Sequence, residues 1–144
     1  MMQIYFSNPS NTVFPFISYP VSCGEAAENN APIEWLSLDD YVSRGRKDSV
    51  LYVRVFGNSM IDLGIESNDL VVIDRLKKAE NGAKVLARLG SEYTIKQFSE
   101  IETYNKRKRF YLVPANEKYR SREVSKKDDF EIIGVVTFLI KSFV

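Results

Sequence analysis

Histidine is absent from the 144-residue sequence, and cysteine occurs only once, at Cys23. A single thiol cannot close an internal disulfide, and the usual cysteine and histidine spacings of zinc sites cannot form. The commonest general base is also missing, so a serine or cysteine nucleophile needs a lysine, a carboxylate or an amine to take its proton. We therefore expect a protein of the reducing cytoplasm that uses no metal and no other cofactor.

Net charge is nearly absent as well. Twenty Lys and Arg residues against nineteen Asp and Glu leave a formal net charge of +1, so no global field draws the chain onto nucleic acid. The only basic cluster, Lys106 to Arg109, falls between two predicted strands. We interpret it as a solvated hairpin tip, with a nucleic-acid or partner contact as the alternative, and expect no sequence-specific DNA binding.

Long apolar runs are missing too. The longest, Ile132 to Ile140, falls far short of the roughly 20 residues that a membrane-spanning helix needs. The apolar stretch from Val13 to Tyr19 is interrupted by Pro15, and no Lys or Arg precedes it, so it lacks the charged region of a secretory signal. The sequence therefore predicts an intracellular protein without a membrane span.

Hydrophobic residues make up 44% of the chain and charged residues 27%, which is ordinary for one globular domain. We expect an extended N-terminal arm over residues 1–32 and a β-domain over residues 33–144. The arm holds four of the five prolines and shows neither a helical nor a strand period. Because its apolar content exceeds that of a solvated linker, we expect it to dock against its own domain or a partner chain.

The domain is predicted to be mostly β with one short helix. Ser37 to Asp40 has the spacing of a capping box and predicts a helix that ends at Gly45. The two-residue link Gly90-Ser91 predicts an antiparallel hairpin. Runs rich in β-branched and aromatic residues predict strands at Val50 to Phe56, Leu70 to Asp74, Lys84 to Leu89, Glu92 to Phe98, Phe110 to Val113 and Phe130 to Ile140.

Two residues suggest chemistry. The segment from Phe56 to Met60 leaves a predicted strand at a glycine and presents Ser59 at a turn. Lys96 lies 96 − 59 = 37 residues later, inside a predicted strand, on the same face as Thr94 and Phe98. Apolar surroundings lower a lysine pKa from about 10.4 toward neutrality, where the free amine can deprotonate a serine. Taken alone, the pair is better explained as a turn serine and an outward-facing strand lysine.

Five blocks of the sequence change that interpretation. They are Gly57 to Ile65, Asn68 to Asp74, Tyr93 to Lys96, Leu112 to Asn116 and Gly134 to Val136. In order and spacing they resemble the peptidase domain shared by LexA-type repressors and UmuD proteins. The resemblance implies a compact LexA/UmuD C-terminal-type β-domain that cuts itself with Ser59 as nucleophile and Lys96 as general base. The backbone N–H groups of Asn58 and Ser59 would stabilise the oxyanion.

The arm carries a second resemblance. Phe14 to Ala27 is similar to the arm of UmuD proteins, whose own cut falls in a Cys-Gly bond, which implies cleavage between Cys23 and Gly24. A small side chain followed by glycine lets an extended backbone approach the nucleophile closely. The alternative for Cys23 is a buried small hydrophobe. Many relatives have Asp where this chain has Asn58, and an acidic residue is frequent where it has Ala83. We expect these two departures from the family pattern to tune activity rather than abolish it.

The biological role follows from the resemblance. A LexA-like repressor would carry a helix-turn-helix head before the cut, and only 23 residues precede Gly24, so we expect a UmuD-like protein of the SOS response. The resemblance implies a homodimer, stimulation by a RecA filament on single-stranded DNA, and action with a UmuC-like translesion polymerase in error-prone repair. The alternative is a non-catalytic regulatory module of a polymerase. A signal-peptidase relative would need a membrane anchor, which the sequence lacks.

Overall fold

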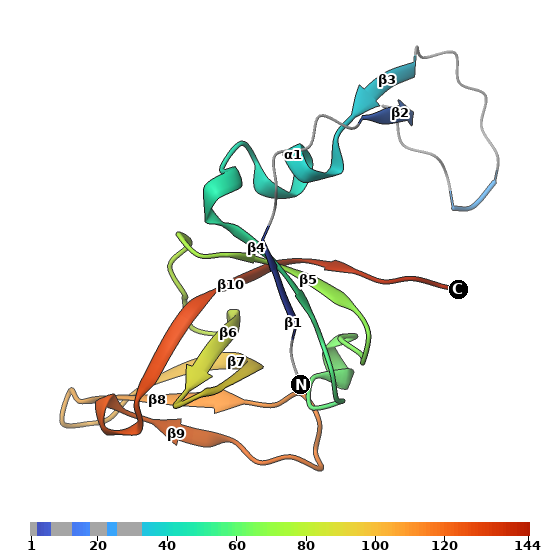
Figure 1. Cartoon of the computed structure of the whole chain (residues 1–144). Helices are drawn as coiled ribbons and strands as arrows, with labels where there is room; N and C mark the ends of the chain where they lie inside the picture. Colours follow the sequence, from blue (N-terminus) through green and yellow to red (C-terminus); the bar gives the residue numbers. More distant parts are fainter. Residues whose placement is uncertain (1–2, 7–12, 18–22, 26–32) are drawn as a thin grey trace.

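The computed structural model describes residues 3–6, 13–17, 23–25 and 33–144, and these are mostly β (Figure 1). The strands are β1 (Gln3–Phe6), β2 (Phe14–Ile17), β3 (Ile33–Leu36), β4 (Val50–Arg54), β5 (Leu70–Asp74), β6 (Lys84–Leu89), β7 (Glu92–Glu102), β8 (Lys108–Val113), β9 (Arg122–Val124) and β10 (Phe130–Ile140). One α-helix, α1 (Leu38–Ser43), and three short 3-10 helices, η1 (Lys47–Ser49), η2 (Ile61–Leu63) and η3 (Lys126–Asp128), connect them. The predicted mostly β fold is confirmed.

Eight strands form one curled antiparallel sheet in the order β1-β4-β5-β10-β6-β7-β8-β9, while β2 and β3 pair separately. The long strand β10 joins the two halves, because one part of it pairs with β5 and the other with β6. Strand β5 lies between two neighbours, and its Val71, Val72 and Ile73 are fully buried. A continuous apolar run is what such a central position requires.

The core next to the loop between β4 and β5 also holds that loop in place. Met60 and Ile65 of the loop are each 2% exposed and pack among buried side chains of four strands. The other members of this cluster are Leu51, Val53, Val55, Val71, Ile73, Leu86 and Ile95. Met60 lies just before the η2 turn and Ile65 just after it, so these two buried side chains fix the loop at both ends of that turn.

Most elements of the domain match the sequence-based expectations. Strands β5, β6 and β10 have the predicted bounds, and β6 and β7 form the predicted hairpin. Strand β4 ends two residues before the predicted Phe56, and β7 and β8 are longer than predicted. Helix α1 is capped by Ser37, whose side chain accepts a hydrogen bond from the Asp40 N–H; its left-handed C-cap is Arg44, one residue before Gly45.

The predicted arm contains strands that the sequence did not reveal. Strand β1 pairs with β4 at the edge of the large sheet, so this part of the arm docks on its own domain. Strand β2, which contains Pro15, pairs only with β3. Four-residue strands are too short to show a period, and proline is tolerated at the edge of a sheet. These short strands are extended segments, as in the predicted arm, although the sequence of the arm shows no strand period.

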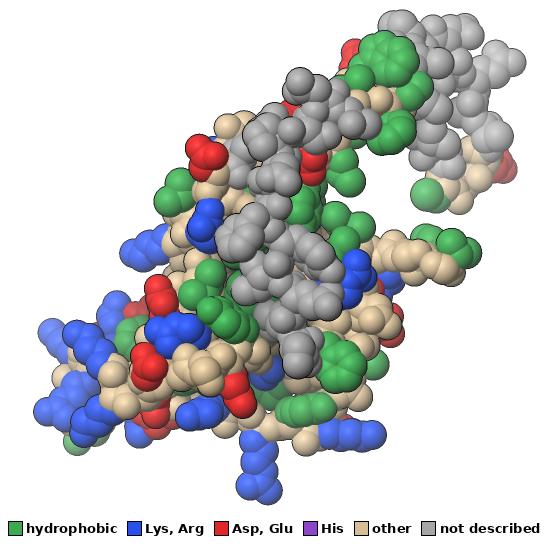
Figure 2. Space-filling view, in the orientation of Figure 1, with side chains coloured by type: hydrophobic (Ala, Val, Ile, Leu, Met, Phe, Trp, Pro, Cys, Tyr) green, Lys and Arg blue, Asp and Glu red, His purple; other side chains and the backbone are tan. Residues whose placement is uncertain are grey.

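The basic cluster lies at the tip of the β7–β8 hairpin, as the sequence predicted. The Thr103 N–H donates to the Arg107 carbonyl at 2.8 Å and closes the turn. Lys108 pairs with Glu100, and Arg109 pairs with Glu123. Figure 2 shows Lys and Arg side chains gathered at this end of the molecule, at the lower left. Half of the cluster is thus already neutralised by carboxylates of neighbouring strands.

Among the described residues, no helix has the length and apolar character of a membrane span. In the same part of the chain, no three His, Cys, Asp or Glu side chains are grouped so that they could hold a metal ion.

Gly134 of strand β10 has no room for a side chain. A Cβ atom there would lie 2.6 Å from Ile73 Cγ2 and 2.7 Å from the Asp74 carbonyl oxygen. We expect Gly134→Ala to lower the free energy of unfolding by about 1–3 kcal/mol through overpacking, measured by urea denaturation. Leu139→Ala, at an exposed position of the same strand, is the control and should cost less. Equal losses in the two variants would contradict the close packing of β10 against β5.

Candidate active site

The loop between β4 and β5 presents Ser59. Its ends are joined by backbone hydrogen bonds, from Val55 N to Asp69 O at 2.9 Å and from Asn68 N to Val55 O at 2.8 Å. Gly57 adopts a φ of 99°, a conformation that glycine reaches without strain, and turns the chain out of the strand direction. With Met60 and Ile65 buried below, Ser59 is held on a fixed turn.

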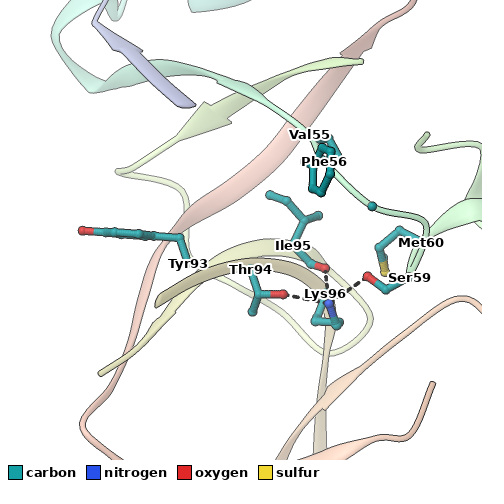
Figure 3. Close-up of a pocket in the computed structure, with 9 residues that line it drawn as sticks. Val55, Phe56, Ser59, Met60, Tyr93, Thr94, Ile95 and Lys96 are labelled. Carbon is teal, nitrogen blue, oxygen red and sulfur yellow. Dashed lines mark hydrogen bonds between the residues drawn. The ribbon is translucent and has the colours of Figure 1, made fainter. Parts of the chain in front are cut away.

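Lys96 reaches Ser59 from strand β7 (Figure 3). Its Nζ lies 2.8 Å from Ser59 Oγ, 2.7 Å from Thr94 Oγ1 and 3.1 Å from the Ile95 carbonyl oxygen. Thr94 and Lys96 are two positions apart on one strand, so both side chains stand on the same face, as the alternation of the sequence predicts. The structure thus brings together the two residues of the expected dyad.

The surroundings of Lys96 favour its neutral form. The side chain is partly buried, and this desolvation lowers the pKa of Lys96 below its ordinary value. Its three hydrogen-bond partners are two hydroxyls and a carbonyl, none of which carries a charge that would offset the loss of water. Once neutral, the amine has a lone pair that can accept the proton of the Ser59 hydroxyl. The arrangement suits a serine nucleophile with a lysine base.

A pocket of about 120 Å³ opens beside the dyad. It is lined by Val55, Phe56, Gly57, Ser59, Met60, Tyr93, Thr94, Ile95 and Lys96. This volume is below that of pockets that enclose small-molecule ligands. It suits a small side chain of a polypeptide whose backbone lies across the opening.

A second segment supports the serine from the far side of the loop. The Ala115 N–H donates to the Ser59 carbonyl at 2.8 Å, and Asn116 Nδ2 donates to the Asn58 carbonyl at 2.9 Å. The Tyr119 hydroxyl donates to Asn58 Oδ1 at 2.6 Å. Neither Asn116 nor Tyr119 was assigned a role from the sequence, although Asn116 ends one of the blocks that carry the resemblance. Their contacts join positions 58 residues apart or more, which no local pattern can reveal.

The expected oxyanion donors are the backbone N–H groups of Asn58 and Ser59. Both belong to the turn that carries the nucleophile. Within the described part of the chain, no hydrogen bond uses either group as donor. Both groups remain predicted donors, available to a substrate carbonyl that Ser59 attacks.

The expected cleavage site is not at the dyad. Residues 23–25 come between β2 and β3 in the sequence, and Figure 1 shows these three residues away from the curled sheet. Cys23 is exposed, so the alternative of a buried small hydrophobe is wrong. Cleavage at Cys23–Gly24 therefore requires the arm to move, or to reach the site of another subunit.

Comparisons with known proteins find sequence relatives over most of the β-domain. A sequence model of the family described as Peptidase S24-like matches residues 15–137. The chain is 33% identical over 91 residues to the LexA repressor of Syntrophobacter fumaroxidans, covering 63% of this chain and 41% of the repressor. It is 39% identical over 109 residues to LexA repressor 2 of Pseudomonas putida, covering 75% and 50%. Protein SamA of Salmonella typhimurium is 33% identical over 107 residues, covering 74% and 69%.

The chain therefore spans about two fifths of the Syntrophobacter repressor and half of the Pseudomonas repressor. It spans more than two thirds of SamA. The matched region in this chain contains strands β4 to β9, most of β10 and the Ser59–Lys96 pair.

Because Lys96 is desolvated and its hydrogen-bond partners are uncharged, we expect its pKa to lie below the ordinary lysine value. Hydrogen bonds to Glu100 and to Asp69 raise the pKa of Lys108 and of Lys141, which makes these residues internal references. We expect the Nζ signal of Lys96, followed by NMR in ¹⁵N-lysine-labelled Ser59→Ala protein, to titrate below the ordinary lysine value of about 10.4. The signals of Lys108 and Lys141 should titrate above it.

The Lys96 signal is assigned by its absence from a Ser59→Ala protein that also carries Lys96→Met. A Lys96 midpoint equal to or above those of the two reference lysines would show that burial does not favour the neutral amine.

Proposed function

Because the chain belongs to the Peptidase S24-like family, we propose that it cuts its own backbone between Cys23 and Gly24 with Ser59 as nucleophile and Lys96 as base. The observation that supports this most is the 2.8 Å contact between Lys96 Nζ and Ser59 Oγ in a site that lowers the lysine pKa. The family includes self-cleaving serine peptidases. No histidine exists in the chain to offer another base.

The proposed reaction has two halves. Neutral Lys96 takes the hydroxyl proton while Ser59 Oγ bonds to the Cys23 carbonyl carbon, and the N–H groups of Asn58 and Ser59 stabilise the oxyanion. The lysine ammonium then gives its proton to the Gly24 nitrogen, and the peptide bond breaks to leave an ester on Ser59. Water, deprotonated by Lys96, hydrolyses the ester. The products are a carboxylate at Cys23 and a new amino terminus at Gly24.

The substrate in this scheme is tethered to the enzyme. A tethered segment has a high effective concentration, so a small pocket is sufficient for recognition. Gly24 has no side chain to obstruct the approach of an extended backbone to Ser59. Because the structure holds this segment away from the dyad, engagement of the arm is a separate step that a partner can control.

We assign this self-cleavage to a UmuD-like role in the cytoplasmic SOS response. In this role a RecA filament on single-stranded DNA stimulates the cut in a homodimer, and the processed form acts with a UmuC-like translesion polymerase. The resemblance of the arm to UmuD proteins supports this role, as does the 69% of SamA that the chain covers. Named LexA repressors among the relatives are consistent with a DNA-damage response.

The second candidate is a non-catalytic module that regulates a polymerase through the domain and its arm. The distance in Figure 1 between residues 23–25 and the sheet favours it, because the uncut bond does not occupy the site. The two candidates differ in whether the chain is ever cut.

The test is intact-mass spectrometry of the purified protein, alone at about pH 10, near the ordinary lysine pKa, and at neutral pH with a RecA filament. We expect a fragment that begins at Gly24 under both conditions. Ser59→Ala should abolish it. Lys96→Arg keeps the positive charge but cannot give up its proton, so it should slow cleavage by about 10²–10⁴-fold.

Each result decides between the candidates. A folded chain that stays whole under both conditions rejects self-cleavage and favours the regulatory module. Cleavage at another bond would retain the dyad and reject the assignment of Cys23–Gly24. A Lys96→Arg protein that is cut as fast as the unchanged protein would remove Lys96 from the mechanism.

A further inference from the structure

The segment that follows β8 holds the peptide unit next to the nucleophile. We propose that Asn116 is a positioning residue for self-cleavage: by binding the Asn58 carbonyl, it fixes the direction of the Ser59 N–H, which is one of the two expected oxyanion donors. This inference rests on the proposed function, since it assigns a role within the same reaction.

The contacts of Asn116 define which end of its carboxamide faces the loop. Its Nδ2 donates to the Asn58 carbonyl at 2.9 Å, and its Oδ1 accepts from the Lys118 N–H at 3.0 Å. Because Oδ1 is held by a backbone donor, Nδ2 is the atom that must face Asn58. The neighbouring Ala115 N–H binds the Ser59 carbonyl at 2.8 Å. Two consecutive carbonyls of the nucleophile turn are thus held by two consecutive residues.

The consequence for the oxyanion donor follows from the planar peptide. The Asn58 carbonyl and the Ser59 N–H belong to one peptide unit, and the described chain contains no cis peptide bond. In a trans unit the C=O and the N–H point in opposite directions, so fixing one fixes the other. Rotation of this unit would turn the N–H away from a carbonyl attacked by Ser59. A donor is effective only when it is already aimed at the position of the developing charge.

Asn116 is the main restraint on this unit. The Ile61 N–H also donates to the Asn58 carbonyl, but at the longer distance of 3.3 Å and from within the same turn, which would move with it. Asn116 acts from a separate segment. That segment is itself tied to the turn by a bond of 2.8 Å from Asp62 N to the Ala115 carbonyl.

Tyr119 provides the comparison. Its hydroxyl donates to Asn58 Oδ1 and so holds the side chain of Asn58 rather than the peptide that carries the Ser59 N–H. An aspartate at position 58 would accept the same bond, so this contact does not depend on the carboxamide of Asn58. Loss of the Tyr119 hydroxyl should therefore affect cleavage much less than loss of Asn116.

The experiment measures the self-cleavage rate constant of the full chain across alkaline pH for four proteins: unchanged, Asn116→Ala, Tyr119→Phe and Glu117→Ala. Glu117 is an exposed neighbour in the same turn and serves as the matched control.

We expect Asn116→Ala to lower the plateau rate about 10- to 100-fold, somewhat less than the loss of a whole oxyanion donor. The pH midpoint should stay unchanged, because the surroundings of Lys96 are intact. Tyr119→Phe and Glu117→Ala should stay within about threefold of the unchanged protein, as expected for a group that does not hold the donor.

Three outcomes would overturn the inference. The first is an Asn116→Ala protein that is cut at the unchanged rate. The second is a midpoint that shifts together with the rate, since this would mean that the Ser59–Lys96 contact has been disturbed instead. The third is an equal loss in Tyr119→Phe. If Asn116→Ala lowers the thermal midpoint, Asn116→Asp repeats the plateau measurement, since it keeps the shape of the side chain and its acceptor but removes the donor.

Failure of the proposed function gives a different pattern. If the unchanged protein is not cut at all, or is cut equally after Ser59→Ala, the self-cleavage mechanism fails and this inference fails with it. If the unchanged protein is cut, Ser59→Ala is not, and the Asn116 variants are cut as fast as Glu117→Ala, self-cleavage stands and the role of Asn116 is rejected.

Discussion

The site depends on a desolvated amine that has no carboxylate among its hydrogen-bond partners in the described residues. Lys96 Nζ is bound by Ser59 Oγ, Thr94 Oγ1 and a backbone carbonyl, all uncharged. Such surroundings destabilise the ammonium form, so the pKa of Lys96 falls and the residue becomes a base. Burying an amine without a counter-charge lowers the stability of the folded protein. The rest of the fold has to hold these atoms in place against that cost.

The curled sheet, the buried side chains of the loop and the segment that follows β8 supply this rigidity. Strand β7 fixes Lys96 by pairing with β6 on one side and β8 on the other. Met60 and Ile65 anchor the turn in the core, while Ala115 and Asn116 bind its carbonyls from the opposite side. Other lysines of the domain show the contrast. Lys141 bridges the carboxylates of Glu66 and Asp69, and its pKa is raised.

The sequence predicted the domain better than the arm, for physical reasons. Strands such as Leu70–Asp74 are long, apolar and bounded by turn residues, so composition alone identifies them. Strands of four residues or fewer, such as β1 and Arg122–Val124, carry too few side chains for a period. The alternation along β7 predicted that Lys96 and Thr94 share a face. The contact with Ser59 needed the family resemblance, and the contacts of Asn116 and Tyr119 needed the folded chain.

A measurement that does not involve the arm tests the neutral lysine most directly. An arylphosphonyl fluoride reacts with activated serine hydroxyls, and its attachment to Ser59 can be followed by mass spectrometry as a function of pH. A neutral Lys96 base predicts labelling that rises along one titration curve with a midpoint below the ordinary lysine pKa of about 10.4, and no labelling after Lys96→Met. Labelling that is independent of pH, or that persists in Lys96→Met, would contradict the role of Lys96 as the base that activates Ser59.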